Sequence, residues 1–470
     1  MKTKKHKVLL ITEGTYPFNG GGVSTWAHML CNEIKNASFS LYSINADYES
    51  QPKYTLGKNI DEIIQVPLWS PLEPQEIFDY GSDYCSTVKR KEKDINDKIE
   101  IKFIPLFKEL LFQIYSSQRN VIVLDATIKS MWKYFNKHDY KKTMQSEIVW
   151  KTFCTTVGEL DDEIGEQRAT LVDLTSAMRW MYRFLMPLSI DVPYADISHL
   201  TISGFPVIPA LILKYKHGTP MVVTEHGVFI RERLLAINSS EFSYFLKKML
   251  ILFSERITEL VYFNADKILS VNEFNKKWEI LYGADAGKIE VIYNGICPDE
   301  FSPKPKPDHL KDIPTVVAAA RIFELKDITT MIKSCAVVKE AIPNVKYLIY
   351  GDKNAVPEYT KKCEELIKEL NLEDNFILAG YHNKPSELFC EGDISILTSI
   401  SEGFPYTVIE SMSCGIPVVA TDVGGVTEAL NDACGRICKP KDHIDIGNKV
   451  IELLLNPELR TRMGENARKR

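Results

Sequence analysis

Two glutamates separated by seven residues, Glu402 and Glu410, could together hold a ligand that carries several hydroxyl groups. Pro405 is suited to the first turn of a helix and predicts one over 406–414. Glu402 then lies on the loop before this helix and Glu410 inside it, near an N-terminus whose N–H groups attract phosphate. One carboxylate can accept hydrogen bonds from a sugar and the other from a ribose diol, with a diphosphate between them. The pattern indicates a nucleotide-sugar site.

The spacing alone leaves an alternative open, in which one glutamate caps a helix and the other is solvated. The surrounding segments favour a site, because a strand-like run at 393–397 precedes the pair and another at 416–420 follows it. Ser-Glu-Gly-Phe-Pro at 401–405, followed by Val-Ile-Glu-Ser-Met at 408–412, resembles the Glu-x7-Glu signature of retaining glycosyltransferases of the GT4 type. The continuation through 414–421 and Gly424-Gly425 resembles the same family.

Length and composition limit the number of domains and the kinds of partner and site that the chain can have. A chain of 470 residues with 45% hydrophobic residues is expected to fold into two or more packed domains. The net charge of -6 argues against a nucleic-acid partner. The ten cysteines include no Cys-x-x-Cys pair, so the sequence predicts neither a zinc site nor a disulfide framework.

The N-terminus carries a short basic stretch over residues 1–7 and then the apolar residues 8–11. That apolar run is too short for the central region of a signal peptide. No uninterrupted apolar run in the sequence approaches the length that spans a bilayer. We therefore expect a cytoplasmic protein.

The first half of the chain alternates strand-like and helix-like segments, which predicts a parallel α/β domain over 1–300. A glycine-rich loop follows the first strand, and an amphipathic helix is predicted from about Val23. The segment from about 69 to 187 breaks the alternation, and its pattern predicts a helical insertion. The strands expected in this half are 7–12, 196–200, 221–224, 267–271 and 290–293.

The second half repeats the alternation after a proline-rich segment, 301–314, that we expect to be a linker. The predicted domain over 315–470 contains strands at 315–320, 345–350, 376–379, 393–397 and 417–420. Together with the GT4 resemblance this implies the GT-B fold, with two Rossmann-like, doubly wound domains facing each other across a cleft. Ligands of such sheets bind beyond the carboxyl ends of the strands.

Two cations follow the first strand of the second half. Arg321 comes directly after the predicted strand, and Lys326 is expected to begin the next helix. In the GT4 family residues so placed neutralise the donor diphosphate, and they stabilise the charge that grows as it leaves. Solvated cations at a helix N-terminus are the alternative, although the helix dipole disfavours them there. The sequence departs from many relatives at Asp327, where they carry glycine.

Several further residues acquire roles from the resemblance. The loop 13–22 ends in three glycines, and Gly21 and Gly22 would let the backbone approach donor or acceptor. His226, after the strand 221–224, would face the donor sugar, whereas a lone histidine there is otherwise more often structural. Tyr381 and His382 would lie where relatives cradle the base. The segment 231–233, Arg-Glu-Arg, could line the acceptor path or form a surface ion-pair cluster.

A narrower resemblance rests on residues 12–17 and 21–24, 226–228 with 231–233, and 321–327. These segments look like PelF-type glycosyltransferases of Pel exopolysaccharide synthesis. The resemblance implies a UDP-sugar donor, UDP-glucose first, a growing polysaccharide as acceptor, membrane-embedded export or synthase proteins as partners, and no metal or other cofactor. It implies catalytic roles for Glu402, His226, Arg321 and Lys326. The donor-binding residues it implies are Gly21, Gly22, Arg321, Lys326, Tyr381, His382, Glu402, Gly403, Phe404, Pro405 and Glu410.

Two other classes of function stay open on the sequence. GT-B folds also host nucleotide-sugar epimerases, which transfer nothing, and a chain of this kind could be a catalytically silent UDP-binding scaffold. GT-B chains usually finish with a long helix that crosses back onto the first domain. This chain stops at 464–470, where relatives continue, so we expect the crossover helix to be missing.

Overall fold

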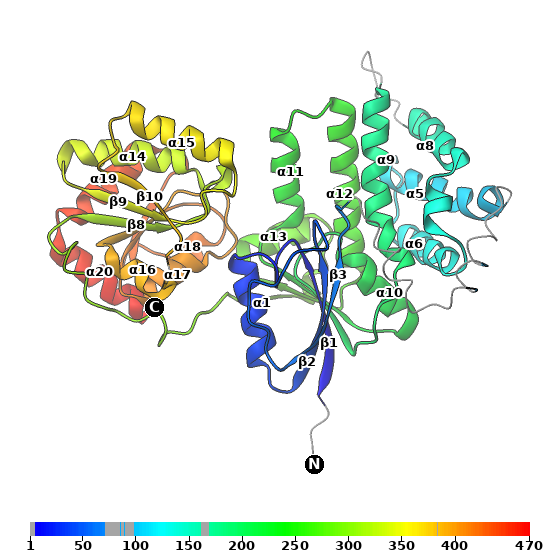
Figure 1. The fold of residues 1–470 in the computed structure, drawn as a ribbon, viewed down its shortest axis with the longest axis horizontal. Helices are drawn as coiled ribbons and strands as arrows, with labels where there is room; N and C mark the ends of the chain where they lie inside the picture. Colours follow the sequence, from blue (N-terminus) through cyan, green and yellow to red (C-terminus); the bar gives the residue numbers. More distant parts are fainter. Residues whose placement is uncertain (1–4, 71–84, 86–88, 90–97, 161–168, 383) are drawn as a thin grey trace. The chain divides into compact units, whose positions relative to one another are not determined.

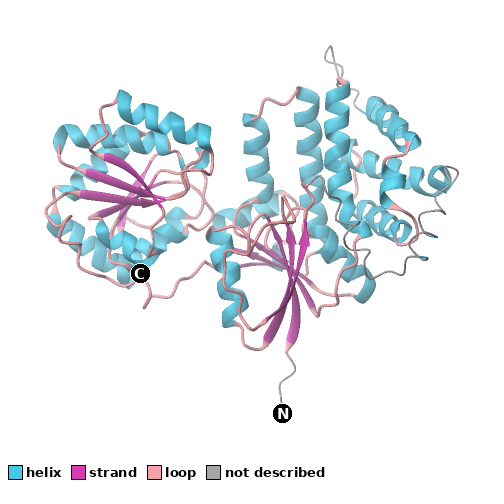
Figure 2. Cartoon of the chain, in the orientation of Figure 1, coloured by secondary structure: helices cyan, strands magenta, loops and turns pink. Residues whose placement is uncertain are grey.

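The chain folds into two units, each built on its own parallel sheet (Figures 1 and 2). The computed structural model describes residues 5–70, 85, 89, 98–160, 169–382 and 384–470. The first unit comprises 1–270 and 276–291, and the second comprises 271–275 and 292–470. The predicted α/β class with two Rossmann-like domains is confirmed.

The sheet of the first unit has seven strands in the order β3-β2-β1-β4-β5-β6-β7, all parallel. Its strands are β1 (His6–Glu13), β2 (Ala37–Ile44), β3 (Ile60–Val66), β4 (Ile197–Leu200), β5 (Met221–Glu225), β6 (Lys267–Ser270) and β7 (Ile289–Val291). Leu9, Leu10 and Ile11 of β1 are fully buried, as expected of a central parallel strand with both faces covered. The strand order reverses between β1 and β4, where ligands of doubly wound sheets bind.

Helices cover this sheet and extend into a helical layer. The helices that follow strands are α1 (Gly22–Glu33), α10 (Val207–His217), α11 (Phe229–Ser239), α12 (Tyr244–Asn264), α13 (Glu273–Leu281) and the short η4 (Ala286–Lys288). The layer consists of η2 (Ile99–Phe103), α5 (Ile104–Tyr115), α6 (Val121–Phe135), α7 (Tyr140–Met144), α8 (Glu147–Leu160), α9 (Leu171–Leu185) and η3 (Met186–Ser189).

The helical layer packs beside α12 and shares one hydrophobic core with the sheet (Figure 1). Phe103 and Phe107 of the layer belong to the same buried cluster as Leu9 of β1. The helical insertion predicted for 69–187 is therefore present in the described residues of that segment, whereas 71–84, 86–88, 90–97 and 161–168 lie outside them. It is part of the domain core.

The second unit has a six-stranded parallel sheet in the order β10-β9-β8-β11-β12-β13. Its strands are β8 (Thr315–Ala319), β9 (Lys346–Tyr350), β10 (Phe376–Gly380), β11 (Ile394–Leu397), β12 (Val418–Thr421) and β13 (Gly435–Cys438). Its helices are η5 (Glu324–Lys326), α14 (Ile328–Ala341), α15 (Pro357–Glu369), α16 (Pro385–Leu388), η6 (Phe389–Glu391), α17 (Tyr406–Ser413), α18 (Val426–Ala429), α19 (His443–Leu454) and α20 (Pro457–Lys469). Here the order reverses between β8 and β11.

The proline-rich segment expected to be a linker at 301–314 packs onto the second unit. Phe301 and Leu310 are buried in one cluster with Val317 and Phe389, because an aromatic ring and a leucine side chain gain by leaving water. Arg468 of α20 donates hydrogen bonds from Nη1 to the carbonyls of Phe301, at 2.8 Å, and of Pro298, at 3.0 Å. The final helix thus fixes this segment to its own unit.

No helix within the described ranges combines the length and the apolar character that a membrane span requires.

Candidate active site

The loop that carries Glu402 leads into α17, as the sequence predicts. α17 begins at Tyr406 with Pro405 as its N-cap, so Glu402 lies on the loop and Glu410 inside the helix. Phe404 anchors the loop: its ring lies 5.0 Å from that of Tyr293, and its carbonyl accepts a hydrogen bond of 3.0 Å from Asn294 Nδ2. These contacts set the direction in which the helix starts.

Lys326 lies two residues before the helix that the sequence expects it to begin. It ends the short turn η5, and α14 begins at Ile328, so the prediction that Lys326 opens the helix is wrong. Asp327 causes the shift, because it takes a left-handed conformation (φ 46°, ψ 52°) and caps α14 through its carboxylate to Thr330 N at 3.3 Å. Aspartate tolerates this conformation better than most residues do. It can therefore stand where relatives carry glycine.

Lys326 and Glu402 meet in an ion pair, with Nζ 2.6 Å from Oε1. The lysine side chain is 23% exposed and the glutamate side chain 10%, so water screens the pair only partly. Ser399 Oγ donates a second hydrogen bond to Glu402 Oε1 at 2.5 Å. The structure thus joins two residues that lie 76 positions apart in the sequence.

The loops that carry this pair are tied together by their backbones as well. Thr398 Oγ1 donates to the carbonyls of Lys326, at 2.9 Å, and Asp327, at 3.1 Å. The amide of Ile400 donates to the carbonyl of Leu325 at 2.8 Å. Lys326 follows β8 and Glu402 follows β11, which are the two strands between which the order reverses. The pair therefore lies at the switch point, where open α/β sheets bind ligands.

Two glycines, Gly424 and Gly425, pack against the backbone of the loop that carries Glu402. Gly425 N donates to the carbonyl of Gly403 at 2.8 Å. Gly424 has a φ of +56°, and a Cβ on it would lie 1.8 Å from the carbonyl oxygen of Glu402. Only glycine allows so close an approach.

Arg321 stands at the same end of the sheet, two residues after β8 ends at Ala319. Its guanidinium lies 5.0 Å from the centre of the Phe323 ring. Its side chain is exposed, and none of the carboxylates in the described ranges forms an ion pair with it. It is a positive charge available to a ligand at the switch point.

Tyr381 and His382 follow β10, which ends at Gly380 with a φ of +77°. Tyr381 is 74% exposed. His382 Nδ1 accepts a hydrogen bond from the amide of Lys384 at 3.0 Å, so the other ring nitrogen, Nε2, carries hydrogen. Nε2 lies 3.1 Å from Glu391 Oε1 and donates to it. The histidine ring is therefore fixed in one tautomer.

Glu410 lies in a poorly hydrated environment beside Tyr406. Burial, together with the charge of Glu300, raises the pKa of Glu410 to about 7. The hydroxyl of Tyr406, one turn earlier in α17, is buried and has no hydrogen-bond partner within the described residues. The carboxyl of Glu410 and the phenol of Tyr406 would both gain from a ligand that carries hydroxyls.

We expect the affinity for UDP-glucose to rise from pH 5.5 to about pH 7 and to level off above it. In its predicted role the ionised Glu410 would accept hydrogen bonds from a diol, which would lower the pKa of Glu410 in the complex below its raised value of about 7 in the free protein. Binding then releases a proton only where the free carboxyl is protonated. Titration calorimetry across this range would measure the trend, because the diphosphate of UDP-glucose does not titrate there.

The matched variant for this prediction is Glu410→Gln, whose affinity for UDP-glucose should be weaker at pH 8 and independent of pH. An unchanged pH profile in Glu410→Gln would contradict the assignment of the trend to this carboxyl.

The remaining predicted residues belong to the first unit and are described within it. Gly21 caps α1 with a φ of +144°, and a Cβ on it would meet no atom within 4 Å. The ring of His226, just after β5, lies 4.5 Å from that of Trp26 on α1. α1, which begins at Gly22, thus packs against His226 at the carboxyl end of the first sheet.

Sequence reasoning missed Ser399 and Glu13. Ser399 holds Glu402, and a hydroxyl two residues past the end of β11 was the signal that could have found it. Glu13 ends β1, and burial raises its pKa to about 7, with Arg233 opposing the shift. A carboxyl at the end of the central strand was visible in the sequence, but its burial was not.

The described residues include no group of three or more histidine, cysteine, aspartate or glutamate side chains that could hold a metal ion.

Comparison with protein families identifies both halves of the chain. Residues 6–287 match the family described as "Domain of unknown function (DUF3492)", and residues 301–470 match "Glycosyl transferases group 1". The chain belongs to the DUF3492 family and carries a group 1 glycosyltransferase domain. The predicted enzyme class, glycosyltransferase, and the predicted GT-B fold are confirmed at this level.

Curated relatives and solved structures agree with the assignment. N-acetyl-alpha-D-glucosaminyl L-malate synthase of Bacillus anthracis is 33% identical over 126 residues, which are 27% of this chain and 32% of that protein. The chain spans less than two thirds of the length of the curated relatives it matches.

Two solved structures cover 99% of this chain and 94% of their own. They are sucrose-phosphate synthase of Thermosynechococcus elongatus (TM-score 0.61, 15% identity) and HepE of Anabaena in complex with UDP-glucose (TM-score 0.60, 14% identity). At this level of identity the similarity concerns the fold.

Proposed function

We propose that the protein is a retaining, metal-independent glycosyltransferase that moves a hexose from a UDP-sugar to a growing exopolysaccharide. UDP-glucose is the favoured donor, and the acceptor is a polymer of the Pel type. The observation that carries the proposal is the Lys326–Glu402 ion pair at the switch point of a group 1 domain. Arg321, which is exposed, follows β8, the strand that also precedes Lys326. The resemblance to PelF-type enzymes and the UDP-glucose complex of HepE support the choice of donor.

Arg321 and Lys326 would bind the diphosphate of the donor. Negative charge grows on the diphosphate as the bond to the sugar breaks, and fixed cations stabilise it more in the transition state than in the ground state. N–H groups around Gly403 and Phe404, next to the start of α17, would add to this field. Two cations so placed can supply the stabilisation that a metal ion supplies in other transferases.

Glu402 would exchange partners when the donor binds. In the described structure its carboxylate neutralises Lys326, with 2.6 Å between Nζ and Oε1. A diphosphate would compete for Lys326, and the oxygens of Glu402 would then accept hydrogen bonds from hydroxyls of the hexose. Glu410 would accept the hydroxyls of the ribose. The ion pair thus keeps both groups in place before the substrate arrives.

The proposed course of reaction follows the GT4 resemblance. No side chain is assigned as a covalent nucleophile, and the leaving phosphate would take the proton of the incoming hydroxyl. The role of His226 in orienting the sugar, and those of Gly21, Gly22, Tyr381 and His382 in donor binding, stay predictions from the same resemblance.

The proposed setting is the cytoplasmic side of the cell membrane. A growing polymer must be exported, so membrane-embedded export or synthase proteins are the proposed partners. The resemblance to PelF-type enzymes is the support for this part of the proposal.

Titration calorimetry with UDP, UDP-glucose, UDP-N-acetylgalactosamine and GDP-mannose tests the donor site. We expect micromolar UDP binding, weak GDP-mannose binding, and a loss of about tenfold or more in Arg321→Ala, because one charge-assisted contact to phosphate is removed. Arg462→Ala is the matched control, since Arg462 is also exposed in the second unit and lies on α20. A folded protein that binds none of these nucleotides would overturn the proposal.

The two other classes of function give different results in the same preparation. Interconversion of sugars without an acceptor would indicate an epimerase. Saturable UDP binding without turnover, even with partner proteins present, would indicate a scaffold.

A further inference from the structure

A cavity of about 420 Å³ opens within the helical layer of the first unit. One face of α9 lines it, together with Trp150 of α8 and with Met144 and Gln145 at the end of α7. A volume of this size is typical of pockets that hold small organic ligands. No residue with a proposed role in hexose transfer lines the cavity, so it is separate from the proposed donor site.

The helix α9 has two chemically different faces. Ala177, Met181 and Phe184 are buried in the hydrophobic core of the unit. The residues that line the cavity recur at helical spacing on another face, and they are Thr175, Met178, Arg179, Tyr182 and Arg183. Arg179 and Arg183, one turn apart, are therefore neighbours at the cavity.

The two arginines have no compensating charge. Like charges one turn apart on a helix repel each other. The lining of the cavity includes no carboxylate, and none of the acidic residues in the described ranges forms an ion pair with Arg179 or Arg183. Arg183 Nη1 is shielded from solvent and has no hydrogen-bond partner within those ranges. Because a buried donor without an acceptor costs free energy, both arginines would gain from an anion in the cavity.

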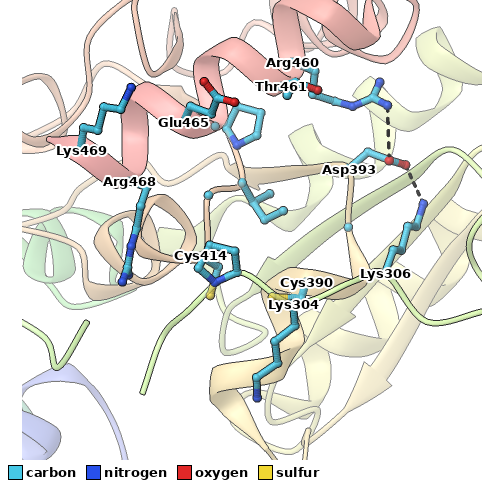
Figure 3. A pocket seen from close by; sticks show the side chains of 16 residues that line it. Lys304, Lys306, Cys390, Asp393, Cys414, Arg460, Thr461, Glu465, Arg468 and Lys469 are labelled. Carbon is cyan, nitrogen blue, oxygen red and sulfur yellow. Dashed lines mark hydrogen bonds and ion pairs between the residues drawn. The ribbon is translucent and has the colours of Figure 1, made fainter. Parts of the chain in front are cut away.

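The cavity in the second unit that Figure 3 shows has a different character. It measures about 540 Å³, and its lining includes no aromatic side chain. Lys306 and Arg460 both point at Asp393, with 2.7 Å between Lys306 Nζ and Oδ2 and 3.5 Å between Arg460 Nη2 and Oδ1. One carboxylate thus serves two of its cations, whereas the charged residues that line the cavity in the helical layer are both cations.

The rest of the lining suits a flat, weakly polar group. Trp150 is half-buried, and its ring lies 6.1 Å from that of Phe153 in the core. Met144 and Met178 add flexible, polarizable side chains that adapt to the shape of a ligand. Indole rings bind nucleobases by stacking, and every base has a face that can stack.

We propose that this cavity binds a mononucleotide, with its phosphate between Arg179 and Arg183 and its base against Trp150. A phosphate monoester carries close to two negative charges at pH 7, which matches the two cations, and the guanidinium fork matches its oxygens. The lining residues come from α7, α8 and α9. A bound nucleotide would therefore connect three helices of the layer and should raise the melting temperature of the protein.

Titration calorimetry of the full chain with AMP tests the site. We expect AMP to bind at one site per chain with the same affinity in wild type and in Arg321→Ala, because Arg321 belongs to the donor site. Arg179 is exposed, so Arg179→Ala should fold normally and bind AMP about tenfold or more weakly. Lys133→Ala is the matched control, since Lys133 is an exposed cation of the same layer that does not line the cavity. Absence of AMP binding, or binding that Arg321→Ala removes and Arg179→Ala does not, would overturn the proposal.

Two further measurements separate a ligand site from a structural role. Ribose 5-phosphate, which lacks the base, should bind about tenfold more weakly than AMP, and equal affinities would rule out the contact between base and Trp150. Arg183→Met keeps the apolar stem and removes the charge. It should lose AMP binding and, without ligand, melt at the wild-type temperature or higher, because no anion compensates the arginine there. A lower melting temperature with AMP affinity retained would assign Arg183 to packing of the layer and refute its role in binding.

Discussion

Lys326→Ala is expected to lower the rate of hexose transfer by about 10²- to 10³-fold, as the loss of one fixed charge at a developing anion typically does. The substitution also leaves Glu402, whose side chain is 10% exposed, with Ser399 as its remaining side-chain hydrogen-bond donor among the described residues. A largely buried carboxylate without its cation is destabilised, so the free energy of unfolding should fall as well, by about 1–3 kcal/mol. Steady-state kinetics and denaturant unfolding measure the two effects separately.

Lys333→Ala is the matched control, because it removes an exposed lysine from α14 in the same unit. It should leave both the rate and the stability within the experimental error. Combining Lys326→Ala with Glu402→Gln should restore part of the lost stability, since the amide does not need a cation. A Lys326→Ala variant that transfers hexose at the wild-type rate would refute the role of Lys326 in charge stabilisation.

The sequence predicted the central strands well, and the reason is physical. β8 and β11 are short, apolar runs bounded by proline, glycine or charged residues, because a strand buried on both faces needs apolar side chains throughout. Their predicted ends agree with the structure to within one residue. The motifs attached to these ends, Arg321 and Glu402, were therefore placed at the correct edge of the sheet.

Two of the four edge strands, β3 and β13, were not predicted, whereas the edge strands β7 and β10 were. β3 (Ile60–Val66) contains Asp61 and Glu62 and is only partly buried, and β13 (Gly435–Cys438) has four residues and begins with glycine. A strand at the edge of a sheet has fewer neighbours and carries more polar residues, so its apolar signal is weak. β2 was missed because Ser38, Ser40 and Ser43 interrupt its apolar pattern, although it lies inside the sheet.

The sequence predicted which residues form the site, but it did not predict their contact or the local backbone conformation. Lys326 and Glu402 were both named, but no periodicity relates residues on two different loops. Their contact follows from the strand order and from the ties made by Thr398 and Ile400. The start of α14 two residues after Lys326 depends on the left-handed conformation of Asp327, which aspartate adopts only in a suitable context.

Gly424→Ala is expected to destabilise the second unit strongly. Gly424 has a φ of +56°, and an added Cβ would lie 1.8 Å from the carbonyl oxygen of Glu402. The left-handed conformation costs alanine about 1–2 kcal/mol, and the collision must also displace the backbone of the Glu402 loop. We expect a loss in the free energy of unfolding above about 3 kcal/mol, which exceeds the usual effect of a substitution. Denaturant unfolding followed by circular dichroism would measure it.

Gly415→Ala separates the two causes, because Gly415 has a φ of +73° in the same unit while its Cβ would meet no atom closer than 3.5 Å. It should therefore show the conformational cost of about 1–2 kcal/mol alone. The difference between the two variants measures how rigidly Gly424 holds the Glu402 loop. Where Gly424→Ala still folds, UDP affinity should fall because the loop between β11 and α17 has moved, whereas Gly415→Ala should bind UDP normally. Equal stabilities of the two variants would mean that the loop yields to the collision, and the position of Glu402 would then be set by its bond to Lys326 rather than by the glycine behind it.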